Sequence, residues 1–237
     1  MTHLAFREDA YRTSIEATVL AINERGGILL DHTVFYPTSG GQPGDTGKFT
    51  WAGGSITIAN TVYDETKNAV HVPTAPDGLP PIGTMLVAEI DWPNRYRNMR
   101  CHTLMHLLCA TVPFPVTGSS ITENGGRIDF DIPEGDVPKK DELAANINAL
   151  ITANHAITTR WISDDELMAN QHLIRTMSVK PPLGTGRIRL VSIADDRVDL
   201  QPCGGTHVRS TAEIGPIVVS KIESKGKINR RIRLAFA

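Results

Sequence analysis

Short runs in which apolar or β-branched residues alternate with polar ones fill about the first ninety positions of the chain. Clusters of Gly, Pro, Asn and Asp separate these runs, and such clusters typically mark turns between strands. No run in this part shows the longer apolar spacing of an amphipathic helix. The pattern predicts a small antiparallel β-barrel with short turns, whose strands we expect at 14–22, 28–35, 55–63, 69–72 and 85–92.

Helical spacing first appears after a group of turn residues near Asn94, and we place a domain boundary there. The apolar-rich segment 95–111 favours an α-helix. It ends before Pro113, because proline cannot continue a helical hydrogen-bond ladder.

A second amphipathic helix is predicted from about Pro138, since proline is tolerated at the first position of a helix. Its apolar stripe, which a sheet should cover, carries Leu143, Ile147, Leu150 and Ile151. Ser163 and Glu166 have the spacing of a capping box, which predicts a short helix through about Gln171. The strands expected around these helices are 128–132, 157–162, 187–193, 198–200, 215–225 and 228–236.

Together these elements predict an α+β fold with two domains. Residues 1–94 are expected to form the barrel, and residues 95–237 a two-layer α/β domain whose helices pack on an antiparallel sheet. Apolar residues make up 41% and charged residues 21% of the 237 residues, which excludes a disordered or fibrous class. No stretch approaches the ~20 apolar residues of a membrane span. The start of the chain also lacks the apolar core of a signal peptide, so we expect a cytoplasmic protein.

The charges are distributed unevenly along the chain. Residues 1–94 carry 5 basic and 11 acidic side chains, whereas residues 95–237 carry 19 basic and 15 acidic ones. The basic bias is strongest in 209–237, which has seven basic side chains against two acidic ones. This terminal segment is therefore the better candidate for contact with phosphate groups of RNA.

A glycine-rich segment lies between the predicted barrel strands. Residues 35–47 read FYPTSGGQPGDTG and contain four glycines. Glycine permits positive φ angles and a close approach of another backbone or a ligand. The composition favours a structural turn, and a ligand-contacting loop is the alternative.

The clearest candidate chemistry is a set of metal-binding side chains. His102 and His106 are four residues apart in the predicted helix 95–111, so both imidazoles can lie on one face and reach a single ion. Cys203 and His207 have the same spacing in a Gly-Gly loop, which can curl so that both side chains point inward. Imidazole and thiolate are the ligands that suit zinc, which binds about four of them.

Plainer interpretations remain open for each half of this set. Two histidines on an apolar helix can be core residues, and a glycine loop ending in histidine can be a turn. If zinc binds, the ion can be structural, with every position filled by protein, or catalytic, with one exchangeable position. The three cysteines show no disulfide framework, so we expect reduced thiols.

These segments resemble the editing domain that alanyl-tRNA synthetase shares with the freestanding AlaX proteins. The resemblance rests first on 97–108, which contains HTLMH, and on 203–208, which reads CGGTHV. Segments 35–47, 118–121 and 224–233 are similar to further signatures of this family, in the same order. The glycine-rich segment resembles part of the N-terminal barrel of the medium-length AlaX form, and because the chain has no room for an adenylating domain it resembles the freestanding trans-editing factor.

The resemblance implies a trans-editing hydrolase that deacylates mischarged alanine tRNA, chiefly the seryl ester, with the glycyl ester as a further candidate. It also implies zinc held by His102, His106, Cys203 and His207. Thr117 matches the threonine that tests the amino acid. Cys203 is in addition a candidate catalytic residue, although direct attack by a zinc-bound thiolate is the less favourable route.

The basic terminal hairpin, with Lys225, Lys227, Arg230 and Arg231, is the expected RNA-binding surface, and a merely solvated face is the alternative. Two other functions compete with editing. The chain can be a non-catalytic RNA-binding module braced by zinc, or a zinc hydrolase that cleaves small esters without tRNA.

Overall fold

The computed structural model describes residues 2–174 and 187–237. Contacts within the chain divide it into two compact units, Met1–Asn98 and Met99–Ala237. The division falls within helix α1 (Trp92–Thr111) and not at Asn94, and the domain boundary near Asn94 stays a prediction. Among the described residues, every helix is too short or too polar to cross a lipid bilayer.

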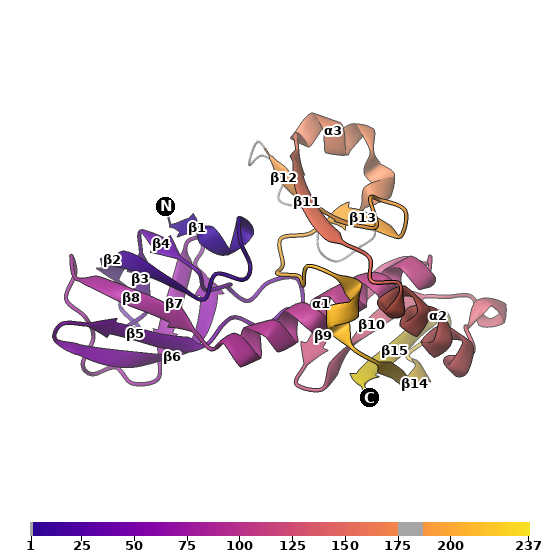
Figure 1. Cartoon of the computed structure of the whole chain (residues 1–237), viewed down its shortest axis with the longest axis horizontal. Coiled ribbons are helices and arrows are strands. Elements are labelled where there is room, and N and C mark those ends of the chain that lie inside the picture. Colours follow the sequence, from indigo (N-terminus) through magenta and orange to yellow (C-terminus); the bar gives the residue numbers. More distant parts are fainter. Residues whose placement is uncertain (1, 175–186) are drawn as a thin grey trace. The chain divides into compact units, whose positions relative to one another are not determined.

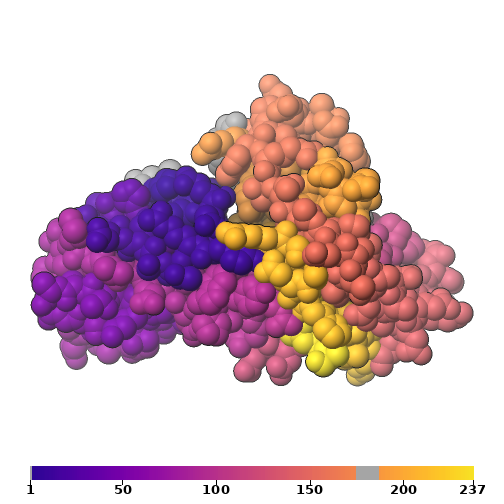
Figure 2. Space-filling view, in the orientation of Figure 1, coloured from indigo at the N-terminus to yellow at the C-terminus, as the bar shows by residue number. Residues whose placement is uncertain are grey.

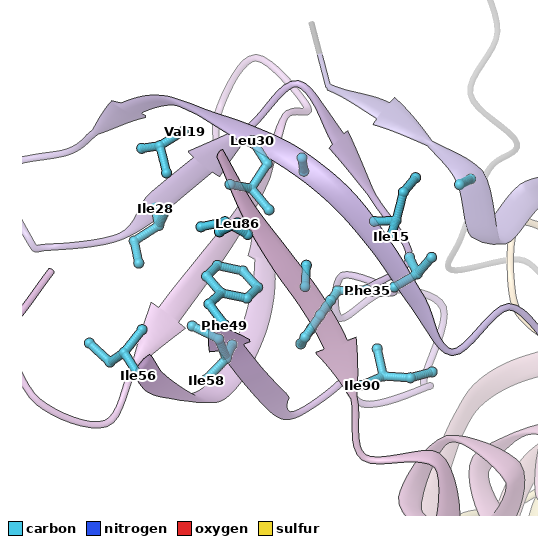
Figure 3. Close-up of a cluster of buried hydrophobic side chains, with 14 residues drawn as sticks. Ile15, Val19, Ile28, Leu30, Phe35, Phe49, Ile56, Ile58, Leu86 and Ile90 are labelled. Atoms are coloured by element: carbon cyan, nitrogen blue, oxygen red, sulfur yellow. The ribbon is translucent and has the colours of Figure 1, made fainter. Parts of the chain in front are cut away.

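The first unit contains a closed antiparallel β-barrel, as the sequence predicts (Figure 1). Its apolar core includes Ile28, Leu30, Phe35 and Phe49, whose side chains point into the barrel (Figure 3). A two-stranded parallel sheet of β1 (His3–Leu4) and β4 (His32–Thr33) and a 3₁₀ turn at Ala5–Arg7 accompany it. In barrel order the strands are β2 (Ser14–Ile22), β3 (Ile28–Leu30), β7 (Ala69–Pro73), β6 (Gly54–Tyr63), β5 (Gly47–Trp51) and β8 (Met85–Ile90).

Two details of the barrel differ from the sequence prediction. The run 28–35 is not one strand but divides at Asp31, whose Oδ1 accepts hydrogen bonds from the backbone N–H groups of Thr18 and His32. Strand β5 was not predicted, because it follows directly on the glycine-rich segment and its short run gives no periodicity of its own.

The glycine-rich segment 35–47 makes close contacts within the barrel unit. A Cβ atom on Gly44 would lie 2.0 Å from the carbonyl oxygen of Thr61, so only glycine fits there. Asp45, in the same segment, accepts hydrogen bonds from the Nε of Arg95 at 3.0 and 2.9 Å and from the backbone N–H of Tyr36 at 2.6 Å. Arg95 and Asp45 are 0% and 1% exposed, so this ion pair belongs to the barrel core.

The second unit contains two antiparallel sheets and the helices that pack on them (Figure 1). The first sheet has the order β14 (Ile217–Ser224), β15 (Asn229–Phe236), β10 (Gly125–Asp131) and β9 (Val116–Thr122). The second has the order β11 (Ile157–Ile162), β12 (Ile188–Ile193) and β13 (Asp199–Pro202). Short 3₁₀ turns lie at Glu134–Asp136, Gln171–Leu173 and Thr211–Ile214. These antiparallel sheets and helices confirm the predicted α+β class.

Helices α2 (Lys140–Thr152) and α3 (Asp164–Ala169) form where the sequence predicts them. The stripe of α2 buries Leu143, Ile147 and Ile151. Asn148 fastens α2 to strand β14 by accepting a hydrogen bond from the N–H of Ile217 and donating one to its carbonyl. A capping box of Ser163 and Glu166 opens α3, as predicted.

Helix α1 is buried on all sides from Cys101 to Cys109, which is typical of a helix in the centre of a domain. One face lies against β10, where the Cys101 thiol donates a hydrogen bond of 2.8 Å to the carbonyl of Gly125. The neighbouring Gly126 permits this approach, since a Cβ there would lie 3.1 Å from the sulfur atoms of both Cys101 and Met105. Helix α1 therefore has a fixed position from which to present its other side chains.

Candidate metal centre

The two histidines of α1 lie one helical turn apart on the same side of the helix. Their ring centroids are 5.3 Å apart, as expected for positions i and i+4. Both side chains are buried, with His102 9% and His106 5% exposed. Helix α1 thus places two imidazoles next to each other on one side.

The loop that follows β13 brings the other two candidate ligands to these histidines. The Cys203 sulfur lies 3.5 Å from Nε2 of His102 and 3.4 Å from Nε2 of His207. One ligand atom from each of His102, His106, Cys203 and His207 lies within 4.8 Å of all the others. Arg189 holds the loop in this shape by donating hydrogen bonds to the carbonyls of Cys203 (3.0 Å) and Gly205 (2.9 Å). The sequence prediction that these side chains meet is therefore borne out, and the cluster can hold a metal ion.

Outer partners orient the imidazoles. Nδ1 of His106 lies 2.8 Å from Oδ2 of Asp199, and the amide of Gln201 donates a hydrogen bond of 2.7 Å to the same oxygen. Nδ1 of His207 lies 3.1 Å from the hydroxyl of Thr103. A carboxylate behind a ligating histidine fixes the ring and raises its basicity as a ligand. Because these contacts occupy Nδ1 of His106 and of His207, Nε2 of these two rings is left to face the cluster.

Sequence reasoning missed Asp199, Gln201 and Thr103. A signal was present, because Asp199 and Gln201 alternate along β13 and Cys203 follows directly after it, so that residues at i, i+2 and i+4 lie on one face. The apolar residues Val198 and Leu200 predict a strand at 198–200. They give no indication that Asp199, which is only 2% exposed, supports a candidate ligand.

The electrostatics of the cluster favour the metal-binding forms of Cys203 and His207, whereas His106 would have to lose a proton before it binds a metal. Burial raises the pKa of Cys203, but the nearby His102 and His207 outweigh this effect and hold that pKa well below its usual value. Burial and the neighbouring His102 hold the pKa of His207 well below its usual range, so this imidazole is neutral. For His106, burial lowers the pKa, but the hydrogen bond with Asp199 and the negative Cys203 raise it to about 10. A thiolate and neutral imidazoles are the forms that bind a divalent metal.

Cys203 lies at the least buried edge of the cluster. The three histidines are buried, whereas Cys203 is only half-buried and the adjacent Gly204 is exposed. A Cβ added to Gly204 would meet no atom within 4 Å. The Cys203 edge is therefore the part of the cluster nearest to solvent.

Thr117 lies at a bulge between strands β9 and β10, where the pairing register shifts. Its hydroxyl donates a hydrogen bond of 3.2 Å to the carbonyl of Asp129 and accepts one of 2.8 Å from the amide of Asn229. A threonine hydroxyl has one donor and two acceptor sites, so one acceptor site remains available. The discriminating role of Thr117 stays a prediction.

The four predicted RNA-binding residues lie at or next to the turn between β14 and β15, in two different environments. Lys225 and Lys227 are exposed. Arg230 is buried and donates hydrogen bonds to the carbonyls of Gly226 and Asn229, which braces the turn. Arg231 makes two hydrogen bonds of 2.7 Å to Asp129 and thereby lowers the pKa of that carboxyl. RNA contact by these residues stays a prediction.

Comparisons with known proteins connect both units to the tRNA synthetases. A family described as the threonyl and alanyl tRNA synthetase second additional domain matches residues 188–233. A family described as tRNA synthetases class II (A) matches residues 8–94. An alanine–tRNA ligase of Pyrobaculum arsenaticum is 33% identical over 94% of this chain, which corresponds to 25% of the ligase. The fold and the site thus define a protein related to one part of alanyl-tRNA synthetase.

Two further relatives match along nearly their entire length. The alanyl-tRNA editing protein AlaX-M of Methanosarcina mazei is 32% identical over 98% of this chain and 95% of the relative. The AlaX-M protein of Pyrococcus horikoshii is 30% identical over 99% of this chain and 97% of the relative. The chain belongs to this family of alanyl-tRNA editing proteins. The family confirms the predicted resemblance and the predicted enzyme class, aminoacyl-tRNA deacylases.

Proposed function

We propose that this protein is a zinc-dependent hydrolase of the cytoplasm that removes serine from mischarged alanine tRNA, with the glycyl ester as a second candidate substrate. The observation that carries the proposal is the convergence of three imidazoles and one thiolate within 4.8 Å, with Cys203 at the least buried edge, in a member of the AlaX-M family. Zinc as the metal, serine as the amino acid removed and alanine tRNA as the carrier are all parts of what we propose.

The donor set fits zinc. Zinc is bound by imidazole nitrogen and thiolate sulfur, usually in four-coordinate sites. Hard cations such as Mg²⁺ instead take oxygen ligands, and none of the four clustered side chains offers one. His102, His106, Cys203 and His207 would hold the ion, and a catalytic site requires that one position stays exchangeable.

The reaction needs only modest assistance, because an aminoacyl ester is already activated. Water adds to the ester carbonyl carbon, the bond to the ribose oxygen breaks, and that oxygen takes a proton. Zinc can polarise the carbonyl oxygen or a water molecule when bound. The chain's own residues keep the site in shape: Asp199 orients His106, Thr103 orients His207, and Arg189 holds the Cys203 loop. In such a preorganised site, developing charge meets groups that need not rearrange.

A deacylation assay tests the proposal. Purified protein with seryl-charged alanine tRNA is expected to release serine, and chelation is expected to stop the release. Binding of that tRNA without accelerated loss of serine would support the RNA-binding module. Hydrolysis of small esters with no preference for tRNA would support the alternative hydrolase.

Asp199→Asn tests the orienting role of the buried carboxylate. Loss of its negative charge behind His106 is expected to weaken zinc binding about 10- to 100-fold. Competition with a chromophoric chelator measures the zinc Kd. Asp196→Asn is the matched control, because Asp196 lies in the turn that precedes β13 but pairs with Arg160 at the surface. Equal zinc affinities of the two variants would contradict the role of Asp199.

Thr117→Val tests the discrimination between serine and alanine. The remaining acceptor site of the Thr117 hydroxyl can take a hydrogen bond from the seryl hydroxyl, and a site built for such a bond rejects the analogue that lacks it. We expect the ratio of kcat/KM for seryl over alanyl ester to fall about 10- to 100-fold. Thr122→Val on the same strand, whose hydroxyl bonds to Gly125, is the control. An unchanged ratio in the Thr117 variant refutes the assignment.

Removing Lys225 and Lys227 tests the terminal hairpin as an RNA-binding surface. Each phosphate contact contributes about one unit to the slope of log affinity against log salt concentration. The Lys225→Ala/Lys227→Ala variant is expected to lower this slope by about one to two, measured by anisotropy with uncharged alanine tRNA. Lys139→Ala/Lys140→Ala removes two exposed charges at the start of α2 and serves as control. Equal slopes of log affinity against log salt for the two double variants would exclude the hairpin as an RNA-binding surface.

A further inference from the structure

Strands β11, β12 and β13 place an aromatic side chain in the same row as a metal ligand. Trp161 on β11 pairs with Arg189 on β12, and the backbone N–H of Cys203 donates a hydrogen bond of 3.0 Å to the carbonyl of Arg189. Residues directly opposite one another in an antiparallel sheet project to the same face. Trp161, Arg189 and Cys203 therefore share one face, and at about 4.8 Å per strand Trp161 lies about 10 Å from Cys203 along the row.

The indole of Trp161 is partly open to solvent and carries a cation. Its side chain belongs to the exposed large hydrophobic residues, with 39% of the residue accessible. The guanidinium of Arg187 lies over the ring, 4.6 Å from its centroid, in a cation–π arrangement. Residues 157–174, coloured salmon, contribute to the outer surface in Figure 2. Among the residues that the structure describes, core packing does not account for the exposure of Trp161.

We propose that Trp161, with Arg187, is a stacking platform for an unpaired base of the RNA whose ester end reaches the metal centre. This inference rests on the proposed function. Single-stranded nucleic acids are recognised by bases that stack on aromatic rings and on arginine guanidinium planes. The distance of about 10 Å along the sheet row is on the scale of a nucleotide. The exposed Arg187, which lies over the ring, supplies positive charge for an adjoining phosphate.

An RNA strand suits this surface better than an apolar protein partner. The exposed neighbours of Trp161 on this face are Thr159 and Arg187, so the accessible part of the ring stands among polar groups. A protein interface would bring further apolar side chains to the patch. Trp161 lies at the exposed end of the row that contains Cys203, whereas Arg189 between them is buried.

Kinetics of two substitutions test the platform. Trp161→Phe retains an aromatic face, whereas Trp161→Leu retains apolar cover without a π face. With seryl-charged alanine tRNA, the leucine variant is expected to raise KM about 5- to 150-fold at nearly unchanged kcat, and the phenylalanine variant to stay within a few-fold of the parent. Zinc content and melting temperature should be equal in both. Val218→Ala, another exposed apolar residue of the second unit, is the control. Equal KM values for the leucine variant and the parent overturn the platform.

A binding measurement separates this inference from the proposed function. The chain has three tryptophans, so Trp51→Phe/Trp92→Phe leaves Trp161 as the only indole. Titration of the zinc-loaded variant with the trinucleotide cytidylyl-cytidylyl-adenosine should quench its fluorescence, and Arg187→Gln should weaken the effect. Absence of quenching overturns the platform even if the parent releases serine. Quenching by a protein that never releases serine would instead overturn the proposed hydrolysis and leave the stacking contact standing.

Discussion

His106→Ala is expected to remove the bound metal and with it the hydrolysis of mischarged tRNA. His106 supplies one of the four clustered ligand atoms and is also the imidazole that Asp199 orients. Loss of an outer partner costs about 10- to 100-fold in metal affinity, and loss of the ligand itself should exceed that range. Metal analysis after dialysis and single-turnover deacylation of seryl-charged tRNA measure the two effects.

A histidine outside the cluster provides the control for this experiment. His172 is exposed in a short 3₁₀ turn, and His172→Ala is expected to leave zinc content and the rate unchanged. Removing zinc from the parent by chelation should reproduce the loss of activity, and adding zinc back should restore it. An active His106→Ala protein with no bound zinc would show that hydrolysis does not depend on this centre.

Arg95→Met is expected to destabilise the barrel unit by about 3–5 kcal/mol, because it leaves the buried Asp45 without its partner. Both side chains are almost fully buried, so the carboxylate cannot regain water without disrupting the core. Such a loss is a large part of a typical stability of about 5–15 kcal/mol. Urea unfolding followed by tryptophan fluorescence gives the difference in free energy.

The surface pair of Arg160 and Asp196 is a matched control for the buried pair. Its guanidinium also makes two hydrogen bonds to one carboxylate, but the side chains are 48% and 39% exposed. Exposed pairs contribute about 0–1 kcal/mol, so Arg160→Met should have little effect. Arg95→Met/Asp45→Leu should recover part of the loss, since no charge remains buried. Equal destabilisation by the two single arginine variants would contradict this account.

Local patterns were sufficient to predict many elements of the fold. Alternating residues predicted most of the barrel strands, the apolar stripe of 143–151 predicted α2, and Ser163 with Glu166 predicted the start of α3. Strand β9 was not predicted, because Gly118 and two serines give it little β-propensity. It forms a strand because β10 pairs with it through most of its length. This pairing with the next strand is a contact that the composition of β9 alone does not reveal.

The candidate site, like the fold, was predictable from local patterns only in part. The two pairs spaced i, i+4 identified His102, His106, Cys203 and His207, because short spacing along the chain limits where neighbouring side chains can point. Whether the two pairs meet depended on how α1 and the β13 loop pack within the second unit. The structure brings them together and adds Asp199, Gln201 and Thr103 behind them.

By itself, the sequence determined the types of most elements and the identities of the candidate metal ligands, since both depend on interactions within a few residues. Only the tertiary structure decided which polar side chains support those ligands, that Arg95 neutralises Asp45, and that Trp161 shares a sheet face with Cys203. These relations join residues that are far apart in the chain. They depend on strand register and helix packing, which arise from the burial of many apolar side chains together and not from any one segment.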